Sequence, residues 1–184
     1  PDEKQMVTSL IKAADMRHEY CIGRTTIEKA KILDKQGEHQ ASSEKYGSAA
    51  ETFERIAQNV ESEEERKELK LIATLSKAWQ KMTLAEAKSS SALYSDASRL
   101  FEQAEDLTPN EKTKMLVLGN SRFCRALEAG TRFVDTRNTD NYSDAMKSLD
   151  EAIDKIRYGA SVLLYAEGTR TLDGKLQPFK RGAF

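Results

Sequence analysis

The chain has 184 residues and a formal net charge of −1, from 29 Lys plus Arg and 30 Asp plus Glu. Hydrophobic residues make up 39% of it, with only 9 Gly and 3 Pro, which excludes a disordered polypeptide and disfavours an all-β sandwich. No run approaches the length of a membrane span, the charged N-terminus predicts no signal peptide, and the near-zero charge gives no reason to expect nucleic acid as a partner.

The two cysteines point to a reducing environment. Cys21 and Cys124 are far apart and form no Cys-x-x-Cys pair, so neither a disulfide framework nor a thiolate metal site is predicted. We expect both to be small buried hydrophobic residues in a cytoplasmic protein. The sequence implies no cofactor and no metal.

Helical periodicity and end signals predict six helices, near residues 3–36, 41–60, 63–88, 91–107, 110–136 and 141–158. Ser62 and Glu65 have the spacing of a capping box. Thr108-Pro109-Asn110-Glu111 offers an N-cap, a Pro in the first turn and an acidic residue at the third position.

A pattern repeats every 48 residues. Each of Tyr46, Tyr94 and Tyr142 is followed by Ala three positions later and by a large apolar residue four positions after that. Upstream, the same offset relates Ile27, Leu75 and Phe123, and it relates Ala30, Ala78 and Ala126. These spacings place the recurring residues on one face of each helix.

The Ala97-x3-Phe101-x2-Ala104-x4-Pro109 segment resembles the second-helix signature of a tetratricopeptide repeat, although the units exceed that family's usual length. We therefore predict an all-α fold of stacked antiparallel helical hairpins over residues 1–158. Its units cover about 14–60, 62–108 and 110–158, and a short non-helical extension follows at 159–184.

Stacked helical hairpins form grooves that bind peptides or helices. Lys29, Lys77 and Arg125 precede the recurring alanines, so stacking would align three cations as a partner-binding face. The alternative is that they are solvated residues beside a buried stripe.

The extension differs in composition from the helical part. Residues 155–184 hold six basic and two acidic groups, a net charge of +4, which leaves the rest of the chain at −5. Ser161-Val-Leu-Leu-Tyr-Ala166 suits a buried strand. Glu167-Gly168-Thr169-Arg170 follows, and after an Asp-Gly turn comes Pro178-Phe-Lys-Arg-Gly-Ala-Phe184.

This extension closely resembles the glycerophosphate-binding motif of the lysophosphatidic acid acyltransferases. The resemblance implies that Gly168, Thr169 and Arg170 contact a substrate of the glycerol 3-phosphate type and that Glu167 orients the loop. A guanidinium group and close backbone approach at Gly suit a phosphate. The alternative is a surface tail with solvated charges.

Residues 130–137 are similar to a second motif of that family, with Thr136 inserted, and they also fit the third helical unit. The boundary between the two patterns therefore falls between about 130 and 159. The family's general base is a His with an Asp five positions later. Here His18 has Gly23 at that position, and His39 has Glu44. We expect His39 to be a solvated residue at a helix start.

The sequence thus supports two functions. The first is a non-catalytic scaffold that binds a protein or peptide in its helical groove, or associates with itself through the extension. The alternative is a fragment of, or fusion with, a 1-acylglycerol-3-phosphate acyltransferase that contributes the glycerophosphate-binding loop.

Overall fold

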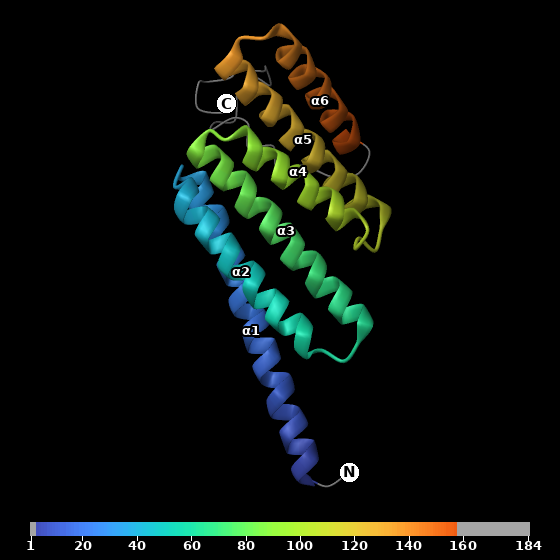
Figure 1. Cartoon of the computed structure of the whole chain (residues 1–184). Coiled ribbons are helices and arrows are strands. Elements are labelled where there is room, and N and C mark those ends of the chain that lie inside the picture. The colour runs from blue at the N-terminus through green and yellow to red at the C-terminus, as the bar shows by residue number, and fades with distance from the viewer. Residues whose placement is uncertain (1–2, 158–184) are drawn as a thin grey trace, which may run out of the picture.

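The fold is all-α, as the sequence predicts. A computed structural model describes residues 3–157, which form six helices that run antiparallel to their neighbours in the chain (Figure 1). They are α1 (Glu3–Lys35), α2 (His39–Asn59), α3 (Glu63–Lys88), α4 (Ser91–Glu105), α5 (Glu111–Thr136) and α6 (Thr139–Arg157). Each helix packs mainly against the helices that precede and follow it. The predicted extension, 159–184, lies outside the described residues.

The helix ends follow local chemistry. Ser62 accepts a hydrogen bond from the backbone N–H of Glu65 at 3.4 Å, which confirms the predicted N-cap of α3. The cap of α5 differs from the prediction. Asn110 rather than Thr108 is the N-cap, because its Oδ1 accepts from the N–H of Thr113 at 2.8 Å. Gly37 has φ +79° and turns the chain between α1 and α2.

The recurring residues form the core. Ala30, Ala78 and Ala126 are all buried, and so are Phe53 and Phe101, which are 48 positions apart. Phe53 lies in a cluster with Ile56, Val60 and Leu69, and Phe101 lies in a second cluster with Leu71, Val117 and Cys124. The 48-residue pattern therefore marks the residues that join successive helices.

The third unit departs from this pattern. Tyr46 and Tyr94 are buried, whereas Tyr142 is 54% exposed. Tyr46 stacks on Trp79 of α3, and Tyr94 packs with Leu127 of α5, so each uses the helix that follows its own. Tyr142 lies on α6, which is the last helix that the structure describes and packs mainly on α5.

The N-terminal end of α1 projects beyond the other helices (Figure 1). This helix has 33 residues and α2 has 21, so an antiparallel pair leaves the first turns of α1 uncovered. No helix of residues 3–157 has the length and apolarity needed to cross a membrane.

Candidate functional site

The predicted substrate-binding residues, Glu167, Gly168, Thr169 and Arg170, lie outside the residues that the structure describes. The predicted partner-binding cations, Lys29, Lys77 and Arg125, lie within the described residues, at equivalent positions of α1, α3 and α5. Lys29 is exposed on α1.

Two of these cations form ion pairs with the preceding helix. The Nζ of Lys77 lies 2.5 Å from Oε1 of Glu54, and Nη2 of Arg125 lies 2.5 Å from Oε1 of Glu102. The two acidic residues are 48 positions apart, and so are the two basic residues. Equivalent ion pairs therefore join α2 to α3 and α4 to α5. The neighbouring carboxylates neutralise most of the predicted basic ladder.

A polar groove of about 640 Å³ lies between α4, α5 and α6. Charged side chains of both signs line it: Arg99, Arg122, Arg125, Arg132 and Lys147, with Glu102, Glu128, Asp144 and Glu151. Glu102 also accepts from the hydroxyl of Ser121 at 3.0 Å, and Nε of Arg122 lies 3.2 Å from Glu151. Three of the groove's arginines are therefore already paired with carboxylates of the same groove.

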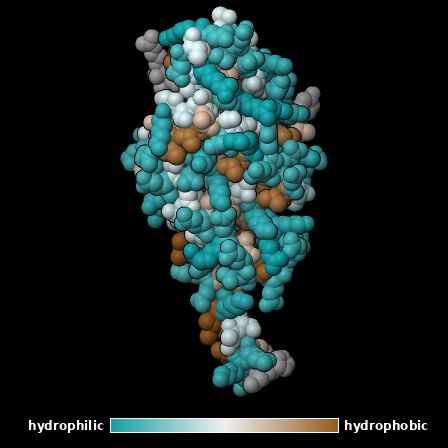
Figure 2. Space-filling model, viewed as in Figure 1, coloured by the Kyte–Doolittle hydropathy of each residue, from teal (hydrophilic) through white to brown (hydrophobic). Residues whose placement is uncertain are grey.

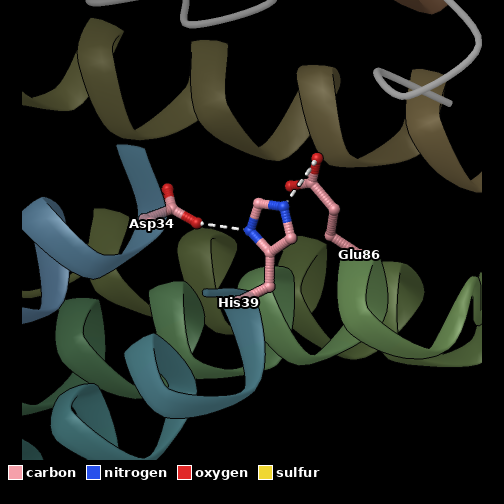
Figure 3. Close-up of side chains that lie close together, drawn as sticks. All are labelled: Asp34, His39 and Glu86. Carbon is pink, nitrogen blue, oxygen red and sulfur yellow. Dashed lines mark hydrogen bonds and ion pairs between the residues drawn. The ribbon is translucent and has the colours of Figure 1, made fainter. Parts of the chain in front are cut away.

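A second cluster joins α1, α2 and α3. Asp34 comes from the last turn of α1, His39 is the first residue of α2, and Glu86 comes from the last turn of α3 (Figure 3). The ring of His39 lies between the two carboxylates, with Nδ1 2.9 Å from Oδ1 of Asp34 and Nε2 3.7 Å from Oε1 of Glu86.

This arrangement corrects the expectation of a solvated histidine, because the His39 side chain is only 24% exposed. Burial, with Asp34 adding to it, raises the pKa of Glu86, and the attraction of His39 opposes that shift. In the acyltransferase motif the Asp follows the His by five positions, whereas here Asp34 precedes His39 by five positions. The contact with Glu86 depends on helix packing, and no local spacing in the sequence indicates it.

Of the two cysteines, Cys124 is buried as predicted and Cys21 is not. Cys124 is fully buried among Phe101, Val117 and neighbouring residues, whereas Cys21 is exposed. Burial raises the pKa of the Cys124 thiol, because a thiolate loses its hydration in an apolar core. Cys21 lies on the surface of α1 beside residues that pack on Phe53.

Two comparisons with known proteins find a resemblance to acyltransferases. An acyltransferase family model matches residues 111–184. The chain is also similar to the chloroplastic 1-acyl-sn-glycerol-3-phosphate acyltransferase BAT2 of Brassica napus, at 50% identity over 36 residues, which are 20% of this chain and 10% of that protein. The chain thus covers about a tenth of this relative. No solved structure matches.

The acyltransferase match begins at Glu111, the first residue of α5, and therefore includes two helices of the array. The comparisons give no support to the tetratricopeptide resemblance, although the array of antiparallel helices is confirmed. The position of the domain boundary stays a prediction.

Proposed function

We propose that the chain contributes the glycerophosphate-binding segment of a 1-acylglycerol-3-phosphate acyltransferase. The family match over residues 111–184 carries this proposal, and the short alignment with the Brassica napus enzyme supports it. The match includes the whole Glu167–Phe184 segment, which has the residue types that a phosphate monoester requires.

In this proposal Arg170 binds the phosphate, since a guanidinium group offers two parallel donors to phosphate oxygens. Gly168 lets the backbone approach closely, Thr169 adds a hydroxyl donor, and Glu167 orients the loop. Lys180 and Arg181 raise the positive potential around the ligand. We assign substrate binding to this segment and no catalytic step, because neither histidine of this sequence has an Asp five positions later.

The test is calorimetric titration of the purified chain with glycerol 3-phosphate and with lysophosphatidate. We expect Arg170→Ala to weaken binding at least tenfold, whereas Lys175→Ala, which removes an equal charge from the same segment, has a much smaller effect. Equal losses in the two variants would indicate nonspecific charge attraction and would contradict a defined loop. Acyl-CoA-dependent acylation by this chain alone would overturn the assignment of binding without catalysis.

A second role, as a helical scaffold of tetratricopeptide-like hairpins, is favoured by the projecting end of α1. Met6, Val7, Leu10 and Ile11 are 54–65% exposed there, and Figure 2 shows hydrophobic residues along this narrow end. Met6, Leu10 and Ala13 continue, at helical spacing, the stripe of Met16 and Tyr20 that packs on α2. A surface that continues a helix–helix interface suits another helix.

We propose that the same segment of a second copy covers this surface. A two-fold axis between residues 8 and 9 would place Met6 opposite Ile11 and Val7 opposite Leu10, so the patch is complementary to itself. The same register places Lys4 opposite Ala13 and Lys12 opposite Gln5, so neither lysine faces another cation. The dimer would present two helical arrays that point away from a central α1 pair.

Sedimentation equilibrium tests this role. The wild-type chain is expected to shift from monomer to dimer as its concentration rises, and Leu10→Lys is expected to remain monomeric. Ile32→Lys is the matched control, because Ile32 is also an exposed apolar residue of α1, at 54%, but lies near the opposite end of the helix. A monomeric wild type, or a Leu10→Lys variant that still dimerises, would contradict the proposal.

A further inference from the structure

The cluster of Asp34, His39 and Glu86 has no part in the proposed glycerophosphate site or in the α1 surface. It is half-buried, with side-chain exposures of 31%, 24% and 33%, and three different helices supply its members. Figure 3 shows the imidazole ring between the two carboxylates, with one nitrogen facing each. Helix packing therefore places a carboxylate oxygen near each of the two ring nitrogens of His39.

Hydrogen bonding determines which ring nitrogen is available. An ionised carboxylate only accepts hydrogen bonds, so the 2.9 Å contact with Asp34 requires a proton on Nδ1 of His39. In the neutral ring, Nε2 then carries a lone pair that faces Oε1 of Glu86 across 3.7 Å. Two electron-pair donors thus face one another, which is the arrangement of a pair of metal ligands.

The helix ends add to this electrostatic picture. Asp34 and Glu86 lie in the last turns of α1 and α3, where the carbonyl ends add negative potential. Two carboxylates and two helix C-termini therefore concentrate negative potential around the His39 ring, which favours a bound cation.

We propose that Nε2 of His39 and the carboxylate of Glu86 bind a divalent zinc-like cation, with Asp34 orienting the ring through Nδ1. Zinc lies about 2.0–2.2 Å from nitrogen and oxygen ligands, so tetrahedral ligand atoms are roughly 3.4 Å apart. The observed 3.7 Å is close to that separation. Carboxylate–histidine–metal triads of this kind fix the ring tautomer. Water fills the remaining positions.

The composition of the site also selects the metal. An imidazole nitrogen with a carboxylate suits Zn²⁺, Cu²⁺ or Ni²⁺, whereas Mg²⁺ and Ca²⁺ prefer sites made of oxygen atoms. The bound cation would join the ends of α1, α2 and α3. We therefore expect it to stabilise the N-terminal half of the helical array.

The test titrates chelator-treated protein with ZnCl₂ and follows the imidazole nitrogens by long-range ¹H–¹⁵N NMR. The chain has only two histidines, so each ring gives a separate signal. Before zinc is added, His39 should be the Nδ1–H tautomer. Zinc should shift its Nε2 and leave His18 unchanged. A shift of His18 alone, or of neither ring, would overturn the proposal without any variant.

Variants then separate the roles. His39→Ala and Glu86→Gln are each expected to lower zinc affinity at least tenfold, and Asp34→Asn to lower it about 10–100-fold through the ring orientation. His18→Ala and Cys21→Ser are controls that remove the other histidine and the exposed thiol, and both should bind as the wild type does. Zinc affinity that falls with Cys21→Ser and not with His39→Ala would assign the metal to the thiol and reject this site.

Discussion

Gly23 of α1 lies directly against the ring of Phe53 of α2. A Cβ atom on Gly23 would be 2.8 Å from Cζ and 2.9 Å from Cε2 of that ring, which is fully buried. The absence of a side chain at residue 23 thus lets the two helices approach closely where Tyr20 also meets Phe53 edge-on, with ring centroids 5.5 Å apart.

We predict that Gly23→Ala destabilises the protein even though alanine favours helices. The gain in helix propensity is about 1 kcal/mol, whereas overpacking of a filled core costs about 1–3 kcal/mol. The expected net loss in the free energy of unfolding is roughly 1 kcal/mol, measured by urea denaturation. Gly47→Ala is the control, because the atoms nearest to a Cβ there belong to the movable end of Gln80. Equal effects of the two substitutions would contradict this packing argument.

The two thiols should react at very different rates. Cys21 is exposed, and Cys124 is buried in the Phe101 cluster, where burial raises its pKa. We expect a thiol reagent such as DTNB to label one cysteine per folded chain rapidly and the second only on unfolding, because the thiolate is the reactive form. Cys21→Ser should remove the fast phase. Two fast phases in the folded wild type would be inconsistent with the described core.

Stability should fall at alkaline pH because of two buried tyrosines. Burial, together with nearby carboxylates, raises the pKa of Tyr46 and of Tyr94 above the ordinary value of 10.0. A raised pKa in the folded state means that their contribution is fully present below pH 10 and is lost as the pH rises further. Tyr46→Phe and Tyr94→Phe should each reduce that loss. Tyr142→Phe, which removes an exposed hydroxyl, is the matched control.

The two equivalent ion pairs should differ in strength. Exposed pairs contribute about 0.2–1 kcal/mol, and Glu54–Lys77 is a single contact. In the Glu102–Arg125 pair, Arg125 also donates from Nε to Ser98 at 3.3 Å, and Ser121 donates to Glu102. Double-mutant cycles should therefore give the larger coupling energy for Glu102–Arg125. Coupling that is stronger for Glu54–Lys77, or absent from both, would show that these added contacts do not matter.

Local patterns were enough to predict the helices. Cap residues and apolar spacing gave six helices whose ends agree with the structure to within two residues, because caps and breaks act over a single turn. The 48-residue spacing also located Ala30, Ala78 and Ala126 in the interior. The exposure of Tyr142 could not be predicted in this way, because it depends on which elements pack over α6.

The His39 cluster was missed for a related reason. Asp34 and His39 are five positions apart across the Gly37 turn, and that proximity could have been noticed in the sequence. Glu86 is brought to His39 only by the packing of α3 against α2. A search for motifs of fixed spacing does not detect a site whose members come from the ends of three helices.

Each described helix makes nearly all its contacts with its sequence neighbours. The helices therefore form a linear series of interfaces rather than one shared globular core. Releasing an outer helix breaks one interface and leaves the inner interfaces intact, so unfolding is expected to advance from the ends toward the middle. In the monomer, the exposed first turns of α1 would exchange their amide hydrogens first. The α3–α4 hairpin would exchange them last.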